Sequence, residues 1–151
     1  MKDKQAKYDR LYMDIARRIS EMSYANRAKV GAVTVKDDNI ISFGWNGTPK
    51  NFNNDCEYYD FVDHIHTKPE VLHAESNAIA KLARSNNTSC GSTLYVSLAP
   101  CYACSKLIIQ AGIERVVYKE EYPKNGLELL KQAGIEIKKL EDETGRTTKT
   151  V

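Results

Sequence analysis

The chain has 151 residues, of which 42% are hydrophobic and 28% are charged, and its 22 basic and 20 acidic side chains leave a net charge of +2. These numbers predict one globular domain with a hydrophobic core, and the near balance of charge argues against a nucleic-acid-binding surface. No apolar run approaches the ~18 residues that span a bilayer. Four cysteines, two of them spaced Cys-x-x-Cys, and no apolar signal region favour metal binding in a reducing cytoplasm over disulfides.

The first part of the chain predicts an amphipathic helix over residues 8–22, after a polar stretch at 1–6 that we expect to fray. Apolar side chains recur there at spacings of four, four and three, which places them on one helical face that packs on the core. This apolar face consists of Leu11, Ile15, Ile19 and Met22.

An antiparallel hairpin is predicted next. Residues 30–35 and 40–45 have strand-like patterns, and the Lys-Asp-Asp-Asn sequence between them is typical of a turn. The second strand leads into Gly-Trp-Asn-Gly-Thr-Pro at 44–49, whose glycines and proline predict an irregular loop. Residues 50–71 show no clear periodicity, and a connection of this length inside a compact domain is usually functional or an insertion.

Two helices and a strand form the middle of the chain. Residues 73–85 predict a helix, and a strand follows at 93–98. Pro100 favours the start of a second helix that runs to residue 111, where Gly112 predicts its end. The buried face of the first helix is expected to consist of Ala78, Ile79, Leu82 and Ala83.

The remaining residues complete an α/β pattern. A strand at 115–119, a helix at 127–133 that ends at Gly134 and a strand at 135–140 call for parallel pairing of these last two strands. A polar tail covers 141–151. The sequence therefore predicts one domain over residues 1–151, with its core at about 8–140. Its fold would be a three-layer α/β/α sandwich, in which a mixed five-stranded sheet carries helices on both faces.

Three side chains at the starts of the two central helices form a set of zinc ligands. His73 supplies an imidazole, and Cys101 and Cys104 supply two thiolates, so a tetrahedral ion keeps an open fourth position as catalytic sites require. Helix starts carry a partial positive charge that favours thiolates. Glu75 follows His73 by two residues and can reach a zinc-bound water, whose pKa the ion lowers, without being a ligand.

Other interpretations use parts of the same set. A redox Cys-x-x-Cys pair would leave His73 and Glu75 without a role. A zinc peptidase would carry His-Glu-x-x-His on one helix, a motif that this sequence lacks. A structural zinc site would need a fourth ligand, for which the available residues are Cys56, Cys90, His64 and His66.

The spacing His-x-Glu followed by Pro-Cys-x-x-Cys is the signature of zinc-dependent nucleobase deaminases. Within that group the chain resembles the deoxycytidylate (dCMP) deaminases of the phage and bacterial type, over residues 8–140. Free cytidine deaminases typically have Cys-Ala-Glu at 73–75, and transfer-RNA adenosine deaminases usually lack Asn77. The resemblance rests on Val30-Gly31-Ala32-Val33, Gly44-Trp45-Asn46-Gly47-Thr48-Pro49, His73-Ala74-Glu75-Ser76-Asn77-Ala78-Ile79 and Ala99-Pro100-Cys101-Tyr102-Ala103-Cys104.

The resemblance implies a cytidine-deaminase-like fold and the hydrolysis of dCMP to dUMP and ammonia, which feeds thymidylate synthesis. Glu75 would move protons from the water to the ring nitrogen and to the departing ammonia. Asn46 would hydrogen-bond the deoxyribose 3′ hydroxyl, and the backbone N–H of Ala74 would hold the pyrimidine carbonyl oxygen. The backbone from Ser97 to Pro100 would line the side of the leaving ammonia, and Tyr122 would pack near the base.

The 5′ phosphate of such a substrate requires cations or helix starts. The candidates are Arg27, Lys29, Arg84 and Lys124. Deamination of dCTP or deoxycytidine is the alternative within enzymes, and a catalytically silent or nucleic-acid-binding protein with a deaminase fold is the alternative outside them.

The resemblance also implies a homohexamer that dCTP activates together with Mg²⁺ and dTTP inhibits. The matching effector region consists of Lys29, Val30, Gly31, Gly44, Asn46 and Gly47. Some members of the family hold a second, structural zinc through a cysteine before the Val-Gly-Ala-Val stretch, where this chain has Ala25 and Asn26. Cys56 with His64 or His66 remains a weak candidate for a second metal, and we expect a single zinc.

Overall fold

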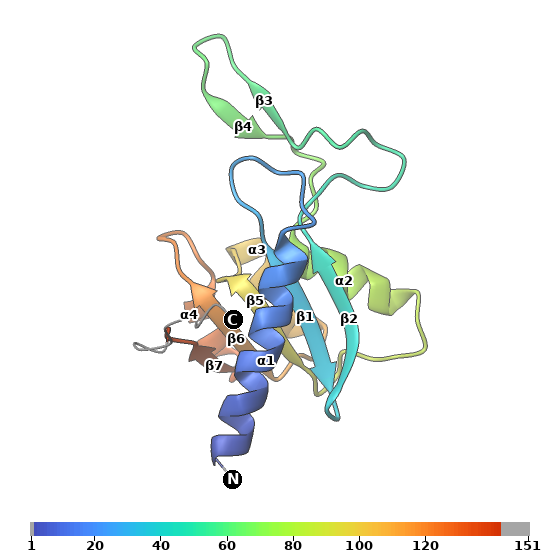
Figure 1. Cartoon of the computed structure of the whole chain (residues 1–151), viewed down its shortest axis with the longest axis vertical. Coiled ribbons are helices and arrows are strands. Elements are labelled where there is room, and N and C mark those ends of the chain that lie inside the picture. Colours follow the sequence, from blue (N-terminus) through green and yellow to red (C-terminus); the bar gives the residue numbers. More distant parts are fainter. Residues whose placement is uncertain (1, 143–151) are drawn as a thin grey trace, which may run out of the picture.

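A computed structural model describes residues 2–142, and Figure 1 shows its layers. A five-stranded sheet lies between one long helix on one face and three shorter helices on the other. The helices are α1 (Lys2–Ser20), α2 (Ala74–Ala83), α3 (Tyr102–Gln110) and α4 (Leu127–Gln132). The strands are β1 (Gly31–Lys36), β2 (Asn39–Trp45), β3 (Glu57–Tyr59), β4 (Ile65–Thr67), β5 (Thr93–Leu98), β6 (Arg115–Glu120) and β7 (Glu136–Lys139).

The sheet is mixed, as the sequence predicts, with the strand order β2-β1-β5-β6-β7. β1 pairs antiparallel with β2 and with β5, whereas β5, β6 and β7 pair in parallel. The predicted hairpin closes at Asp37 and Asp38, whose φ angles of 50° and 61° match the left-handed geometry of a tight two-residue turn. Parallel pairing of β6 and β7 across α4 confirms the prediction for the last two strands.

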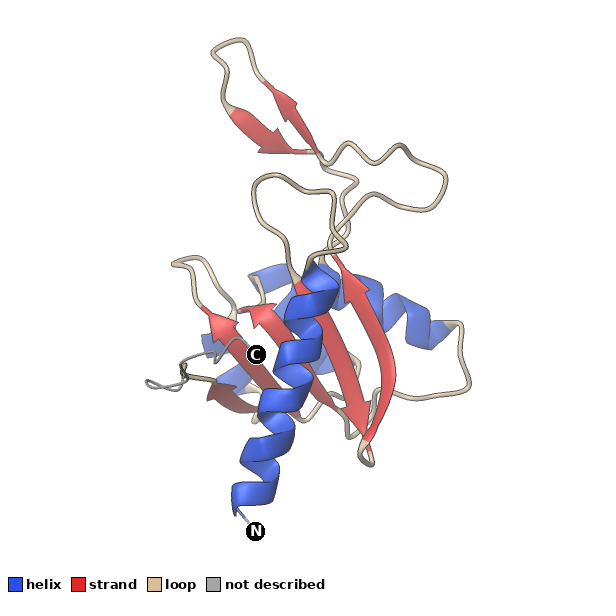
Figure 2. Cartoon of the chain, viewed as in Figure 1, coloured by secondary structure: helices blue, strands red, loops and turns tan. Residues whose placement is uncertain are grey.

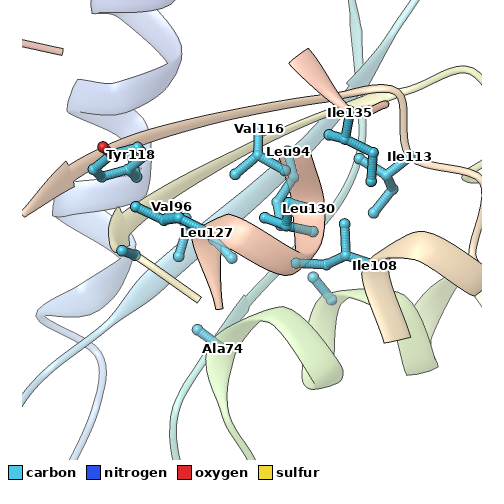
Figure 3. Packing of buried hydrophobic residues seen from close by; sticks show 13 residues of the cluster. Ala74, Leu94, Val96, Ile108, Ile113, Val116, Tyr118, Leu127, Leu130 and Ile135 are labelled. Carbon is cyan, nitrogen blue, oxygen red and sulfur yellow. The ribbon is translucent and has the colours of Figure 1, made fainter. Parts of the chain in front are cut away.

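Alternate residues of the central strands face opposite layers. In β5, Leu94 and Val96 pack beneath α2, α3 and α4, whereas Tyr95 packs against α1, and none of the three is more than 1% exposed. Figure 3 shows the larger of the two clusters, to which α2 contributes Ala74 and α3 contributes Ile108. A strand that is buried on both faces reads as a nearly continuous apolar run, which explains why the Leu-Tyr-Val segment was recognisable in the sequence.

Helix α1 differs from the prediction in its start and in its buried face. The prediction that residues 1–6 fray is wrong for residues 2–6, because the helix begins at Lys2. Two residues of the predicted stripe are exposed, Leu11 by 48% and Met22 by 50%. The helix buries a face that includes a charged and a small residue, which an apolar periodicity does not detect. The side chains that α1 buries are Asp9, Tyr12, Met13 and Ala16.

The long connection between β2 and α2 contains a second, two-stranded sheet. β3 and β4 pair antiparallel, with Glu57 opposite Thr67 and Tyr59 opposite Ile65. Figure 1 shows this β3–β4 hairpin projecting from the body of the molecule, above the loop that joins α1 to β1. Figure 2 shows that long loops gather at this same end of the main sheet.

Smaller differences concern helix ends and the tail. α2 buries Ala78 and Leu82 as predicted, but Ala83 is exposed because it is the last residue of the helix. The predicted polar tail at 141–151 lies outside the described residues from position 143 onward. No helix within residues 2–142 combines the length and apolar character needed to cross a membrane.

Candidate metal centre and substrate cavity

Three side chains meet where α2 and α3 begin. His73 is the N-cap residue of α2, and Cys101 is the N-cap residue of α3. The Nδ1 atom of His73 lies 3.4 Å from the Sγ atom of Cys101 and 3.4 Å from that of Cys104. The three predicted ligands, separated by up to 31 positions in the sequence, thus form one compact group.

The chemistry and spacing of this group fit a zinc ion. Nitrogen and sulfur ligands at about 2.1 and 2.3 Å from a tetrahedral zinc lie about 3.6 Å from each other, close to the separations of 3.4 Å observed here. One imidazole and two thiolates are also the donor types that zinc prefers. Within residues 2–142, no fourth His, Cys, Asp or Glu belongs to the group. The site therefore has the three protein ligands of a catalytic centre, not the four of a structural one.

The backbone around Cys101 holds the thiolates in place. The N–H group of Cys104, in the first turn of α3, donates to Sγ of Cys101 at 3.4 Å. The N–H group of Gly126 donates to the carbonyl of Pro100 at 2.8 Å, and Asn125 forms a β-bridge with Cys101. The partial positive charge at the start of α3 favours the deprotonated form of both sulfurs.

Glu75 lies beside the metal ligands without joining them. Its side chain is buried, with only 4% of the residue exposed. Burial raises the pKa of the Glu75 carboxyl, although a hydrogen bond from Cys104 and the charge of His73 act in the opposite direction. Burial and the neighbouring Glu75 carboxylate also raise the pKa of the Cys104 thiol. A bound divalent cation would reverse the effect on the thiol, because coordination deprotonates it.

A cavity of about 370 Å³ opens beside this group, within the size range of small-molecule sites. Most of the residues that the sequence assigns to catalysis and substrate binding line it together. They come from the end of β2, the starts of α2 and α3, and the segment after β6. The predicted residues that line the cavity are Asn46, His73, Ala74, Glu75, Cys101 and Tyr122.

Asn46 joins two segments of the cavity wall. Its Oδ1 accepts a hydrogen bond from the N–H of Val30 at 2.8 Å, and its Nδ2 donates to the carbonyl of Ala28 at 2.7 Å. Since an amide group offers two donors and two lone pairs, each side retains capacity for a ligand hydroxyl. Asn46 is therefore both a structural residue and an available hydrogen-bonding partner.

Tyr122 lies within electrostatic reach of the metal ligands. Burial raises its pKa to about 12, and the negative charges of Cys101 and Glu75 act in the same direction. Its carbonyl accepts a hydrogen bond of 2.7 Å from Nδ2 of Asn125, the residue that is bridged to Cys101. The segment that carries Tyr122 is thus anchored to the start of α3.

The stretch from Ser97 to Pro100 reaches the cavity through its two middle residues. Leu98 and Ala99 line the cavity, whereas the hydroxyl of Ser97 accepts a hydrogen bond of 3.0 Å from the N–H of Gly31. Ser97 itself lines a second cavity of about 300 Å³, which lies between the end of α1 and the loop that precedes β1.

The four candidate cations for a phosphate lie in different places. Arg27 lines the cavity of the metal centre, and Lys29 lines the second cavity. Arg84 is the C-cap of the ten-residue helix α2, roughly 15 Å along the helix axis from His73. The assignment of Arg84 to substrate binding is therefore wrong, because the helix carries it away from the site. Lys124 is exposed and is not part of the cavity lining.

The sequence reasoning missed a wall of the cavity that the 50–71 connection supplies. Cys56, Glu57, Thr67 and Val71 all line it. The two strands of the β3–β4 hairpin have three residues each, which is too short for an alternation of apolar and polar residues to register. The available signal was a pair of short segments with aromatic or β-branched residues, Glu-Tyr-Tyr at 57–59 and Ile-His-Thr at 65–67, around a turn that contains Asp60 and Asp63.

Two glycines of the predicted effector region are required by packing. A Cβ atom at Gly31 would lie 1.9 Å from the carbonyl oxygen of Ala16, and one at Gly44 would lie 2.7 Å from that of Ala74. These close approaches bring α1 and α2 against the sheet. Packing alone therefore accounts for a glycine at each of these two positions, with no need for a bound effector. The effector region stays a prediction.

Cys56 does not join the histidines of the hairpin. It is 2% exposed and its Sγ lies 3.6 Å from the carbonyl of Asn54. The Nε2 of His66 instead lies 2.8 Å from Oδ2 of Asp60, and the Nδ1 of His64 lies 3.6 Å from the same atom. Within the described residues, the grouping of Cys56 with His64 or His66 as metal ligands is therefore not formed.

Comparisons with known proteins agree with this geometry. The family model described as "Cytidine and deoxycytidylate deaminase zinc-binding region" matches residues 6–120. The deoxycytidylate deaminase of Enterobacteria phage T4 is 33% identical over 83% of this chain and 86% of that protein. That of Mycobacterium phage D29 is 36% identical over 76% of this chain and 95% of that protein. The crystal structure of the cyanophage S-TIM5 dCMP deaminase with dCMP and dUMP is similar, with a TM-score of 0.83 and 42% identity over 89% of this chain and 97% of that one.

Proposed function

The chain belongs to the cytidine and deoxycytidylate deaminase family, and we propose that it is the zinc-dependent enzyme that hydrolyses dCMP to dUMP and ammonia. One observation carries this proposal. A His/Cys/Cys group with the spacing of a zinc site lies next to a buried glutamate, and both border a cavity large enough for a nucleotide. Relatives named deoxycytidylate deaminases, and a similar structure that holds dCMP and dUMP, support the choice of substrate.

The reaction exchanges the amino group on C4 of cytosine for an oxygen atom from water. Bound by His73, Cys101 and Cys104, zinc would supply Lewis-acid chemistry that makes this water acidic near neutral pH. Glu75 would take a proton from the water and deliver it to N3 of the ring, and then help to protonate the departing ammonia. Burial raises the pKa of this carboxyl and the charge of the bound ion would lower it, two opposing effects on a group that must accept and release a proton in one cycle.

Substrate binding would use the polar groups of the cavity wall. The N–H of Ala74 lies in the first turn of α2, where amides have no acceptor within the helix, and would donate to the pyrimidine carbonyl oxygen. Asn46 would bind the 3′ hydroxyl, and the backbone between Ser97 and Pro100 would line the side from which ammonia leaves. Tyr122 would pack near the base.

Regulation and assembly are part of the same proposal. By family resemblance, the protein would form a homohexamer that dCTP with Mg²⁺ activates and dTTP inhibits. The effector would bind near Lys29, Gly44 and Gly47. Light scattering with and without these nucleotides would measure the assembly, and a monomer that is insensitive to both effectors would remove this part of the proposal. The predicted cytoplasmic location stays a prediction.

The test of the proposed activity is ammonia release by zinc-loaded protein. We expect turnover of dCMP, and we would measure deoxycytidine, dCTP and an RNA anticodon stem-loop in parallel. A rise in dCMP turnover with dCTP and Mg²⁺ would support the regulatory site. If the protein deaminates another of these substrates but not dCMP, the assignment of dCMP as substrate is refuted, and the proposed zinc-dependent deamination is kept.

A further inference from the structure

The β3–β4 hairpin makes three hydrogen bonds to the loop that precedes β1. Oε1 of Glu57 accepts from the backbone N–H of Asn26 at 2.8 Å and from that of Arg27 at 3.1 Å. Oγ1 of Thr67 accepts from Nη1 of Arg27 at 3.1 Å. Glu57 and Thr67 are opposite each other in the hairpin register, so a single cross-strand pair holds both the backbone and the side chain of Arg27.

These three residues line the same cavity as His73 and Glu75. Among the side chains of residues 2–142 that line it, Arg27 is the one with a permanent positive charge. Lys29, Arg84 and Lys124 do not line this cavity. A substrate that places its reacting base at the metal centre and carries an anionic group at its other end would find its counter-charge at Arg27.

The contacts leave Arg27 both oriented and available. A guanidinium has five N–H donors in a rigid fork, and Thr67 receives one of them. The remaining donors can form the paired, charge-assisted hydrogen bonds that phosphate oxygens favour. The carboxylate of Glu57 alone would repel a phosphate, but its Oε1 is engaged by two backbone N–H groups. Holding the loop before the ligand arrives reduces the ordering cost of binding.

We infer that the β3–β4 hairpin is the specificity element of the site: through Glu57 and Thr67 it positions Arg27 as the cation that binds the 5′ phosphate of the substrate. The inference rests on the proposed function, because the phosphate is that of the proposed nucleotide. It assigns Arg27 to binding, and it assigns Glu57 and Thr67 to positioning, since they act through Arg27.

The test compares dCMP with deoxycytidine, which lacks the phosphate. For Arg27→Gln we expect kcat/KM for dCMP to fall about 10- to 100-fold, mainly through KM, and kcat/KM for deoxycytidine to change less than about twofold. Arg18→Gln is the matched control, because it removes the same charge from an exposed residue of α1 that pairs with the equally exposed Glu21 just after the helix. Equal losses for both substrates, or no loss for dCMP, would overturn the inference.

The positioning role has its own readout. Glu57→Ala and Thr67→Val should lower the ratio of dCMP to deoxycytidine turnover in the same direction as Arg27→Gln. Glu57→Gln and Thr67→Ser each retain an acceptor oxygen and should restore most of that ratio. Hairpin variants that depress turnover of both substrates equally, without recovery by the conservative variants, would reduce the hairpin to a structural element and contradict the positioning role.

Binding of the product separates this inference from the proposed function. Calorimetry with dUMP and deoxyuridine measures phosphate recognition without catalysis, and Arg27→Gln should lose the preference for dUMP. Wild-type protein that deaminates none of the cytosine compounds would refute the proposed function. Wild-type protein that deaminates dCMP and keeps its preference for dUMP in Arg27→Gln would refute only the inference about Arg27.

Discussion

Glu75 is 4% exposed, although a glutamate is rarely this buried without a functional or structural partner. Its neighbours are the metal ligands themselves. Burial raises the pKa of the Glu75 carboxyl, and the hydrogen bond from Cys104 partly offsets this rise. Burial beside a cation site is the arrangement that tunes a carboxyl for proton transfer near neutral pH. Among single residues, Glu75 is thus the one that we propose transfers the protons of the reaction.

Glu75→Gln keeps the shape of the side chain and removes its ability to accept a proton. We expect kcat for dCMP to fall at least about 100-fold while the zinc content stays at that of the wild type. Ammonia release and metal analysis on the same preparation measure both quantities. Full turnover by a zinc-loaded variant would contradict the role of Glu75 as proton carrier.

Asp9 is the second buried acid, on the other face of the sheet. It is 0% exposed, and Arg115 binds both of its carboxylate oxygens at 2.8 Å while the hydroxyl of Tyr95 donates to one of them. Burial alone would raise the pKa of Asp9, but the hydrogen bonds from Arg115, Tyr95 and Gln5 outweigh it and lower the pKa. The pair joins α1 to β6 and so holds this helix on its face of the sheet.

Asp9→Asn should cost about 3–5 kcal/mol of unfolding free energy at neutral pH, because it removes the buried carboxylate that binds both Nη atoms of Arg115 and leaves the guanidinium only the exposed Glu136, 3.2 Å from its Nε. Since the folded pKa of Asp9 is lowered, its stabilising effect is complete above the unfolded pKa of about 3.9 and is lost as the pH falls through the folded value. The difference between wild type and variant should therefore shrink below about pH 4.

Urea denaturation at several pH values measures this difference. Asp14→Asn, on the exposed surface of the same helix, is the control and should stay within about 0.5 kcal/mol of the wild type. A difference between wild type and Asp9→Asn that does not change with pH would exclude the ion pair as its source.

At the scale of elements, the close contact of β2 with α2 sets the position of the first metal ligand. A Cβ at Gly44 would lie 2.7 Å from the carbonyl oxygen of Ala74 and 2.7 Å from the nitrogen of Ala78. Both are helix backbone atoms, which cannot rotate away as a flexible side chain can. The register of α2 on the sheet, and with it His73 at the helix start, depends on this glycine.

Gly44→Ala should therefore cost about 1–3 kcal/mol in stability and weaken zinc binding, because it displaces the start of α2. Gly47→Ala is the matched control for stability, since the nearest atoms to its Cβ are those of the Trp45 ring at 3.9 Å. Thermal unfolding and zinc titration would measure the two effects. A Gly44→Ala protein with unchanged zinc affinity would show that α2 tolerates the shift.

At the scale of the whole molecule, zinc would join parts of the chain that are far apart in sequence. It would link the start of α2 to the start of α3, two helices that share one hydrophobic cluster. A ligand that binds only the folded state adds about 2.7 kcal/mol at a hundredfold excess over its Kd. For a protein of this length, that corresponds to a rise in Tm of roughly 5–10 °C.

Chelation should therefore abolish activity and lower the Tm by this amount, and zinc should restore both at one ion per chain. Cys101→Ser should lose the ion, whereas Cys90→Ser should retain it, because Cys90 is exposed and lies outside the ligand group. Plasma emission analysis and calorimetry measure the stoichiometry and the Tm. Two ions per chain would reveal a second metal site.

Some features at each of these scales could be predicted from the sequence, and others could not. His73 with Glu75, and Cys101 with Cys104, are predicted from short spacings at two helix starts, and the zinc-deaminase signature relates the two pairs although they lie 28 positions apart. The buried face of α1 is predicted in part: Ile15 and Ile19 pack against the core, whereas Leu11 and Met22 are exposed. Asp9 is missed because it is buried by a partner 106 positions away that no local pattern contains. The pairing and parallel direction of the last strands followed from general rules of chain connection.

By itself, the sequence predicted the layered α/β fold from periodicity within single elements. It predicted the three metal ligands and the acid beside them from the His-x-Glu and Pro-Cys-x-x-Cys signature, whose two parts the fold brings together from positions 28 to 31 apart. The tertiary structure alone decided which cation shares the cavity with the metal centre. It brought Arg27 into the cavity, carried Arg84 away along α2, and folded the 50–71 connection into a hairpin that contacts the loop before β1. The physical reason is that a cavity wall forms by contacts between distant segments, and their relative positions are set by the packing of the whole domain.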